Sequence, residues 1–489
     1  MNPLSILRLT DVRRMNGAAE RDLQLDRLFS AHTLRVLRSA TADDHGVTIR
    51  NRQEIFERMA DPGFVMRMNA LRDALVHLSK QLELLGNARV EFEQICLRLS
   101  GLKAYLAFAK ALQALDGAAE LFCRSNAALR EDFPTSVQSS LRDDLSRSFD
   151  LLGKMRTSLF LLTESAEIAD RDWLLNDRVE PSLATQLTAL AEKMGIVLPI
   201  SDCRPMKTDE TLGAALLQLY ATEAELLRQI IGRYDRLDLQ APSELLNELR
   251  FFFEIQALQK QAAEQGIPTC LPRISADKCY RATKVYDITL TLQSCPSIVP
   301  NPVDFSSDTP VQFLIGANGG GKTTYLRAVG VNLLLFLAGC PIFAESATIY
   351  PFSAVYTHFP ADESFTGLGR LDSEKLRIDR ILEIADADSF FLLNETFSAT
   401  DEEKGFRMAL QTAEHLRARE TFGLYVTHFL EIKNQDFPVL SAVVEGESNR
   451  RTFQIRRQDG AASSYAADIL RKYGLDADSL AQRRRRDGN

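Results

Sequence analysis

The chain has 489 residues, of which 45% are hydrophobic and 25% are charged, and its formal net charge is −8 at pH 7. This length predicts two or three domains, and the acidic balance excludes a general electrostatic attraction to nucleic acid or anionic lipid. Seven cysteines without a C-x-x-C pair argue against a disulfide framework or a zinc site. The sequence shows no signal peptide and no apolar run near 20 residues, which predicts a soluble, cytoplasmic protein that does not bind membranes.

Residues 1–270 are predicted to form a mostly α-helical domain. The clearest helical stripe has apolar residues at alternating spacings of four and three: Phe64, Met68, Leu71, Leu75, Leu78, Leu82 and Leu85. Gly86 and Asn87 end this helix. Further helical patterns cover about Val90–Leu115, Leu141–Ala166, Glu210–Tyr234 and Ser243–Gln265. We interpret these stripes as surfaces for helix packing rather than as sites of chemistry.

Residues 271–475 are predicted to form an α/β domain. Short strand patterns occur at Ile288–Leu292 and Val311–Ile315. Helix, strand, helix and strand patterns then follow at Thr323–Ala338, Phe390–Leu393, Lys404–Ala418 and Thr421–Val426. This order predicts a parallel sheet with helices on both faces. The remaining residues, 476–489, form a basic tail that we interpret as solvated, with a nucleic-acid contact as the less favoured alternative.

A glycine-rich segment lies between the strand Val311–Ile315 and the helix that follows it. The segment fits G-x-x-x-x-G-K-[ST], the phosphate-binding loop, and consists of Gly316, Ala317, Asn318, Gly319, Gly320, Gly321, Lys322, Thr323 and Thr324. Glycines let backbone N–H groups surround phosphates, and the helix N-terminus adds positive potential. We therefore expect Lys322 to contact the β- and γ-phosphates of ATP and the Thr323 hydroxyl to bind Mg²⁺.

A second polar group follows the predicted strand at Phe390–Leu393. Asn394 and Glu395 stand where such sites usually carry an Asp-Glu pair, in which the Asp supports Mg²⁺ and the Glu activates water. Asn394 brings no charge but can hydrogen-bond Thr323 or a magnesium-bound water, and Glu395 is the candidate general base. His428 follows the next strand and is a candidate contact to the γ-phosphate or to water. The pattern favours an active ATPase, with a slow or binding-only site as the alternative.

These motifs resemble the ATPase domain of the MutS family of DNA mismatch-repair proteins. The resemblance is carried by Gly316–Arg327, Pro300–Pro302, Thr427–Glu431 and Gln458–Tyr465. The last two segments are not general features of phosphate-loop proteins, which makes the resemblance specific. It is strong from about residue 288 to residue 475 and weak in the helical half. It implies an α/β P-loop domain of the ATP-binding-cassette (ABC) type, preceded by a helical core and lever domain.

The sequence departs from the family at three positions near the site. Asn394 replaces the family's aspartate. Ile298 or Val299 stands where the family has an aromatic residue beside adenine. The signature segment that a partner subunit presents to ATP is Gly367–Ser373 here, and Ser373 is a candidate for its serine.

The length also departs from the family, because it leaves no room for a separate mismatch-reading domain. That domain wedges the phenylalanine of a Phe-x-Glu motif into the base stack. Phe252, Phe343 and Phe429 each begin such a pattern. We interpret all three as accidental because one lies in the middle of a predicted helix and two lie in the ATPase domain.

The resemblance implies an ATP-gated homodimer whose helical arms close around double-stranded or branched DNA, mainly through backbone contacts. One alternative is an ATP-gated dimeric scaffold or regulator that does not bind DNA, which the acidic charge and Asn394 favour. Another is a transporter-type cassette subunit, against which the match at Gln458–Tyr465 argues.

Overall fold

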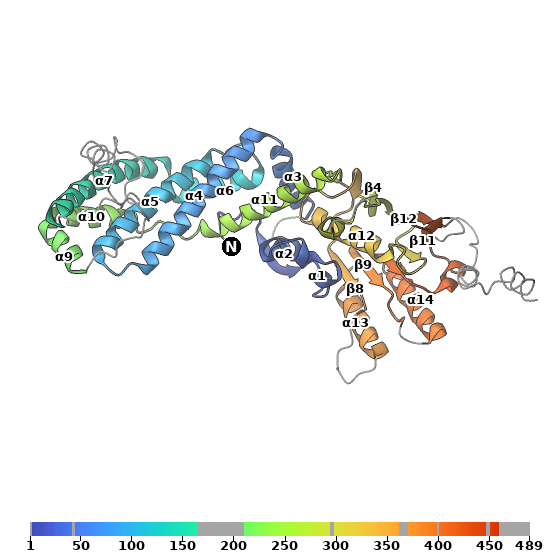
Figure 1. Ribbon diagram of the computed structural model, residues 1–489. Coiled ribbons are helices and arrows are strands. Elements are labelled where there is room, and N and C mark those ends of the chain that lie inside the picture. Colours follow the sequence, from blue (N-terminus) through green and yellow to red (C-terminus); the bar gives the residue numbers. More distant parts are fainter. Residues whose placement is uncertain are drawn as a thin grey trace, which may run out of the picture. The chain divides into compact units, whose positions relative to one another are not determined.

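The computed structural model describes residues 2–41, 45–163, 210–293, 298–360, 370–398, 401–445 and 450–458, coloured along the sequence in Figure 1. The chain divides into two compact units. A helical unit comprises Met1–Ile6 and Arg58–Leu249, and an α/β unit comprises Leu7–Glu57 and Arg250–Asn489. The two compact units divide the chain after Ile6, Glu57 and Leu249. The domain boundary that the sequence suggests near residue 270 stays a prediction.

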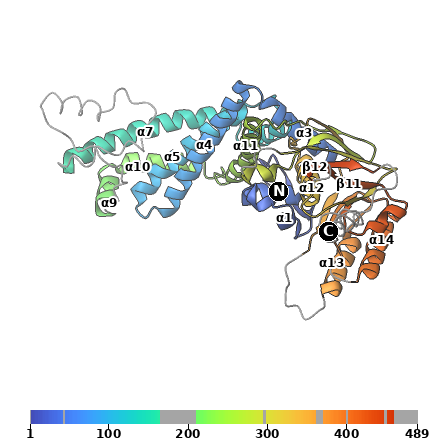
Figure 2. The same cartoon turned by 45° about the vertical axis from the view of Figure 1, so that its right-hand side comes forward.

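The helical unit is built from long helices: α4 (Pro62–Asn87), α5 (Glu91–Gln113), α6 (Glu120–Asp132), α7 (Thr135–Thr163), α9 (Glu210–Leu219), α10 (Ala221–Arg233) and the first residues of α11 (Ser243–Glu264). Helix α5 is its centre and packs against α4, α7, α9 and α10; Figure 2 shows α7 running alongside α5 and α10. The predicted apolar stripe is confirmed in α4, because its members from Phe64 to Leu78 are buried. Asp61 caps this helix by accepting hydrogen bonds from the backbone N–H groups of Gly63 and Phe64.

The helix predicted at Glu210–Tyr234 is instead two helices, α9 and α10, joined at Tyr220. The backbone of Tyr220 leaves helical geometry, although its N–H still donates to the Leu216 carbonyl and its own carbonyl accepts from Ala224. Hydrogen bonding thus continues through the junction, which is why the apolar periodicity hides the break. Helix α10 is tied to α7 through Asp144, which accepts from the Tyr234 hydroxyl at 2.9 Å.

The main sheet of the α/β unit confirms the predicted parallel arrangement. Its order is β12-β11-β6-β10-β9-β8, and all neighbours pair in parallel except the edge strand β12. The strands are β6 (Val311–Ile315), β8 (Ala354–His358), β9 (Ser389–Asn394), β10 (Phe422–Val426), β11 (Val439–Glu445) and β12 (Arg450–Arg457). Because parallel strands end at one edge, the residues that follow β6, β9 and β10 come together there.

Helices cover both faces of this sheet, as predicted. Helix α12 (Lys322–Leu337) packs on β8, β9 and β10 on one face. Helices α13 (Arg370–Ile384) and α14 (Glu402–Ala418) share a hydrophobic core with the other face, and Figure 1 shows them side by side. A smaller sheet of order β3-β7-β4-β5 also contacts α12 through β4. Its strands are β3 (Arg273–Ile274), β4 (Cys279–Val285), β5 (Asn301–Ser306) and β7 (Ser346–Ile349).

The strand predicted at Ile288–Leu292 is wrong, because this segment forms the 3₁₀ helix η4 (Ile288–Gln293). The Asp287 carboxylate accepts from the backbone N–H of Thr289 at 3.0 Å and from the Thr289 hydroxyl at 2.7 Å. The Thr291 hydroxyl donates to the Ile288 carbonyl. These local bonds compete with strand pairing and outweigh the alternating pattern.

The N-terminal segment of the α/β unit supports the C-terminal end of α12. The segment comprises β1 (Leu9–Arg13), α1 (Ala19–Asp22), η1 (Leu25–Arg27), α2 (Ala31–Arg38), β2 (Ser39–Thr41) and α3 (His45–Arg58). The buried Arg14 donates to the Leu337 carbonyl, and the buried Arg52 donates to the Ala338 carbonyl at 3.1 Å. The two guanidinium groups satisfy carbonyls that a helix end leaves free, and their charge is favourable there.

All three Phe-x-Glu patterns belong to packed parts of this unit. Phe252 is fully buried in α11 with its ring centroid 5.2 Å from that of Phe56. Phe343 and Phe429 are buried as well. In the described ranges, no helix has the length and apolar character that would let it cross a bilayer.

Asn332 provides a test of how α12 is fixed in the unit. Its side chain, fully buried, accepts from the Phe343 N–H at 2.7 Å and donates to the Tyr286 carbonyl at 3.0 Å. Asn332→Leu leaves both backbone groups without that partner, so we expect local opening of α12 to become easier by about 2 kcal/mol or more. Hydrogen exchange of the α12 amides measures this free energy. The control Asn434→Leu, at an exposed position, should change it little; equal effects would contradict the assignment.

Candidate nucleotide-binding site

The glycine-rich loop connects the buried strand β6 to the first turn of α12. Gly316 and Gly321 have positive φ angles of 138° and 92°. A Cβ at Gly316 would lie 2.9 Å from the Cβ of Ala442 on β11, so only glycine fits this approach. Gly321 is the N-cap of α12 and offers no side chain to its first turn. The N–H groups of that turn are therefore available to an external acceptor.

Lys322 lies inside the curve of the loop. Its Nζ donates to the carbonyl oxygens of Gly316 at 2.8 Å and Ala317 at 3.3 Å, and to Oδ1 of Asn318 at 3.4 Å. The side chain is 4% exposed, and Nζ is 3.9 Å from a carboxylate oxygen of Glu395. Burial lowers the pKa of Lys322, while the charge of Glu395 acts in the opposite direction. The loop thus holds a dehydrated cation that an anion would stabilise.

The structure brings Thr323, Asn394 and Glu395 to the same edge of the sheet. The Thr323 hydroxyl donates to Oδ1 of Asn394 at 3.5 Å, and Asn394 is buried at the end of β9. Glu395 is half-buried, and its backbone N–H donates to the carbonyl of Val426 on β10. A hydroxyl, an amide oxygen and a carboxylate are oxygen ligands or hydrogen-bond acceptors of the kind that suit Mg²⁺ and its waters.

The backbone that carries Glu395 is strained and held from three sides. Glu395 and Phe397 have φ angles of 47° and 66°, which are unfavourable for residues with a side chain. The Phe397 N–H donates to the buried Glu374 of α13, and the hydroxyl of Tyr425 on β10 donates to the Thr396 carbonyl. The Thr396 hydroxyl contacts Nδ1 of His358, on β8, at 3.1 Å. These contacts hold the backbone segment that begins at Glu395.

His428 follows β10, but its imidazole is exposed and lies against Phe429, with 4.3 Å between the ring centroids. Its proposed contact with nucleotide stays a prediction. Other predicted features fall on residues outside the described ranges: Gly367–Gly369 of the signature segment, Asp459–Tyr465 and the basic tail. Ser373 lies in the first turn of α13.

Sequence reasoning missed two residues that border the loop, Arg451 and Phe453 on β12. A Cβ at Gly319 would lie 2.6 Å from Nη1 of Arg451, and a Cβ at Gly321 would lie 3.4 Å from the ring of Phe453. Phe453 is 46% exposed and has a φ of 58°. The pairing of β12 with β11 is irregular here. Asn301 holds this bulge, because its side chain donates to the Phe453 carbonyl and accepts from the Ile455 N–H. The alternation of Arg450–Arg457 could have predicted an edge strand, but not its position beside the loop.

The fold and the site together define an α/β protein whose glycine-rich strand-to-helix junction encloses a buried lysine. Comparison with known proteins shows which proteins of this class the chain is similar to. Residues 312–482 match the family model for MutS domain V. The chain is 30% identical over 165 residues to an endonuclease MutS2 of Streptococcus mutans, a match that covers 33% of this chain and 21% of that protein. It is 31% identical over 166 residues to a DNA mismatch repair protein MutS of Natronomonas pharaonis, which covers 33% and 19%.

A further match, 33% identical over 191 residues, is an endonuclease MutS2 of Halothermothrix orenii, covering 37% of this chain and 24% of that protein. The matched part thus spans about a fifth to a quarter of the length of these relatives. Residues 312–482 are thus similar to domain V of the MutS family, and this part of the chain carries the match.

The buried His358 predicts a pH dependence of stability. Burial, and then the charge of Arg377, lowers the pKa of His358 to about 4 from the ordinary value of 6.5. The unfolded chain therefore binds a proton more readily between these values, and the stability contributed by neutral His358 is complete above pH 6.5 and lost as the pH falls towards 4. We expect a loss of about 3 kcal/mol over this interval.

Urea unfolding of the protein at several pH values measures this loss. His358→Gln should flatten the dependence between pH 6.5 and 4, and His415→Gln, at an exposed position of the same unit, should leave it unchanged. Identical slopes in the His358 variant and the wild type would contradict a neutral buried imidazole.

Proposed function

We propose that the α/β unit binds ATP with Mg²⁺ at the Gly316–Thr324 loop and hydrolyses it. The observation that carries this proposal is the position of Lys322. Its buried ammonium group is held by three loop oxygens and lies 3.9 Å from the half-buried carboxylate of Glu395. A polyphosphate replaces the loop oxygens as the partner of this cation and relieves the cost of its burial. The match of residues 312–482 to the family model for MutS domain V supports the same conclusion.

Each polar residue then has a defined task. Lys322 binds the β- and γ-phosphate oxygens, together with the first-turn N–H groups of α12. Thr323 and Asn394 hold Mg²⁺ or its waters, and the ion supplies charge neutralisation at the phosphates. Glu395 orients the attacking water and accepts its proton. The contact of 3.5 Å between Thr323 and Asn394, together with the strained backbone at Glu395, supports these assignments.

Phe453 offers a surface for the adenine ring. Neither Ile298 nor Val299 can stack on a base as an aromatic side chain does, whereas Phe453 is half exposed and borders Gly321. The guanidinium of Arg451, beside Gly319, adds positive charge at the phosphate end. The base and the phosphates would thus be contacted from β12 as well as from the loop.

We further infer that two copies of the chain form composite ATP sites and that nucleotide controls a DNA-binding state. The support is the match to MutS domain V and the names of the relatives, an endonuclease MutS2 and a DNA mismatch repair protein MutS. With a net charge of −8, DNA binding would depend on local groups and would be sensitive to salt. Asn394 favours a second candidate, an ATP-bound scaffold with slow turnover, because it places no negative charge beside the metal.

Lys322→Ala removes the buried charge on which phosphate binding depends. We expect the affinity for ATP to fall by about 100-fold or more. Titration of a fluorescent ATP analogue measures this affinity. Lys404→Ala, an exposed lysine of the same unit, serves as the control and should bind normally. Retained affinity in the Lys322 variant would remove the loop as the nucleotide site.

Glu395→Ala should separate binding from turnover. The affinity for ATP should remain, while steady-state hydrolysis should fall by about 100-fold or more, because no other group replaces a positioned general base. Glu403→Ala, on the exposed start of α14, is the matched control. A Glu395 variant with wild-type turnover would show that another residue activates the water.

A further inference from the structure

One arginine of the edge strand β12 rests on the glycine-rich loop. If Gly319 carried a Cβ, that atom would lie 2.6 Å from Nη1, 3.0 Å from Cζ and 3.3 Å from Nη2 of Arg451. The guanidinium group as a whole therefore lies against Gly319, and a side chain at position 319 would push it away. Gly319 also has a φ of 71°, a conformation that favours glycine. The loop thus leaves room for this arginine.

The backbone on either side of β12 holds Arg451 in this position. The Thr452 hydroxyl donates to the carbonyl of Val443 on β11 at 2.7 Å. The side chain of Asn301, on β5, donates to the Phe453 carbonyl at 3.0 Å. Because both β11 and β5 hold the strand here, Arg451 is carried to the loop by a backbone with defined contacts.

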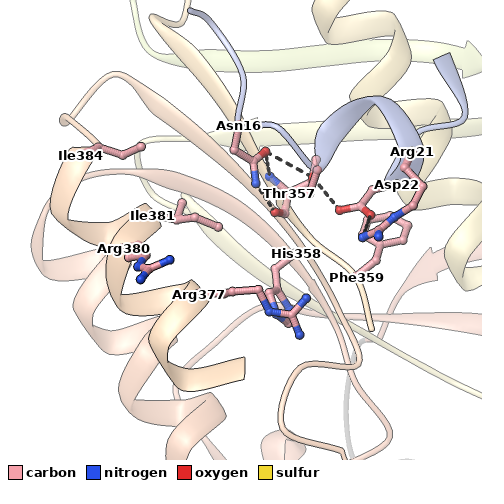
Figure 3. A pocket seen from close by; sticks show the side chains of 11 residues that line it. Asn16, Arg21, Asp22, Thr357, His358, Phe359, Arg377, Arg380, Ile381 and Ile384 are labelled. Carbon is pink, nitrogen blue, oxygen red and sulfur yellow. Dashed lines mark hydrogen bonds and ion pairs between the residues drawn. The ribbon is translucent and has the colours of Figure 1, made fainter. Parts of the chain in front are cut away.

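The guanidinium group of Arg451 is exposed and has no acceptor of its own. Among the residues that the structure describes, it forms neither an ion pair nor a hydrogen bond. Other arginines of the unit are engaged. Arg456, on the same strand, donates to Oε1 of Gln454 at 2.8 Å. Arg21, in the apolar depression beside β8, pairs with Asp22 at 3.2 Å (Figure 3). A guanidinium group without an acceptor, beside a loop whose geometry suits an anion, is available to that anion.

The ammonium group of Lys322 indicates which end of a nucleotide would face Arg451. In loops of this kind the lysine contacts the β- and γ-phosphates. Here its Nζ lies at the first half of the loop, bonded to oxygens of residues 316–318. Gly319 follows directly on this half, whereas Phe453, the proposed surface for adenine, borders the end of the loop at α12. The terminal phosphate would therefore lie on the side of Arg451.

We propose that Arg451 binds the γ-phosphate of ATP and thereby makes the site prefer ATP over ADP. This inference rests on the proposed function of the loop as an ATP site. ADP lacks the phosphate that the guanidinium group contacts, so only ATP gains the charge-assisted hydrogen bonds. Because Arg451 and the loop belong to the same chain, this preference does not require a second copy.

The affinities for the two nucleotides, measured by calorimetric titration of the full chain with Mg²⁺, test the proposal. The β,γ-imido analogue of ATP replaces ATP, so that hydrolysis does not disturb the titration. In Arg451→Ala we expect binding of the analogue to weaken by about tenfold or more and binding of ADP to change by less than about twofold. Arg451→Lys keeps the charge but not the planar fork, and it should recover part of the loss. Damage to the fold would instead weaken both nucleotides.

Arg456→Ala is the matched control, because Arg456 lies on the same strand and bonds to Gln454. It should leave both affinities unchanged. Equal weakening of both nucleotides in Arg451→Ala, or no weakening of either, would overturn the proposal. Lys322→Ala separates this failure from a failure of the ATP site. If Lys322→Ala loses both nucleotides while Arg451→Ala keeps the wild-type ratio, only the role of Arg451 is refuted. If Lys322→Ala still binds both, the loop is not the site and both proposals are refuted.

Discussion

The buried ammonium group of Lys322 is the constraint on which the α/β unit depends. A lysine that is 4% exposed must have oxygen partners, and the loop supplies them by turning its carbonyls inward between β6 and α12. That turn requires positive φ angles and close approach to β11, which glycine alone allows at Gly316. The same geometry leaves the first turn of α12 open. The burial of this one charge therefore accounts for the conformation of the loop, for the glycine at position 316 and for the site that an anion can occupy.

The rest of the unit fixes the helix that carries this lysine. Arg14 and Arg52 satisfy its C-terminal carbonyls, and Asn332 ties its middle to the neighbouring segments. The central sheet forms the opposite side of the site. There, a strained backbone carries Glu395, and contacts from Glu374, Tyr425 and His358 hold the two residues that follow it. Residues far apart in the sequence thus converge on a few atoms, which is the arrangement expected of a site that must be rigid to act.

Much of the fold could be predicted from patterns with a clear physical basis. The run Val311–Ile315 forms a strand, and all five of its residues are buried in the central sheet. The buried stripe of α4 follows from the spacing of its apolar residues. The strand predicted at Ile288–Leu292 is wrong because Asp287 and Thr289 form local hydrogen bonds, which favour a 3₁₀ helix over strand pairing. The break at Tyr220 could not be predicted from the apolar spacing, because helical hydrogen bonding continues through it.

Within the site, the loop, Asn394 and Glu395 could be recognised from the order of motifs, whereas Phe453, Arg451 and His358 could not. Their positions depend on strand order and on a bulge fixed by Asn301, and neither is visible in local sequence. The assignments of His428 and of a partner subunit's signature segment remain predictions.

The central claim is that nucleotide chemistry at Lys322 and Glu395 is coupled to DNA. Steady-state ATP hydrolysis, measured with and without linear, mismatched and branched duplexes at low and moderate salt, tests it most directly. The account predicts slow hydrolysis whose rate changes when duplex DNA is added, with a smaller change at higher salt because the contacts are mainly to phosphates. Hydrolysis that no DNA changes, or ATP binding without hydrolysis, would contradict the coupling and favour an ATP-bound scaffold.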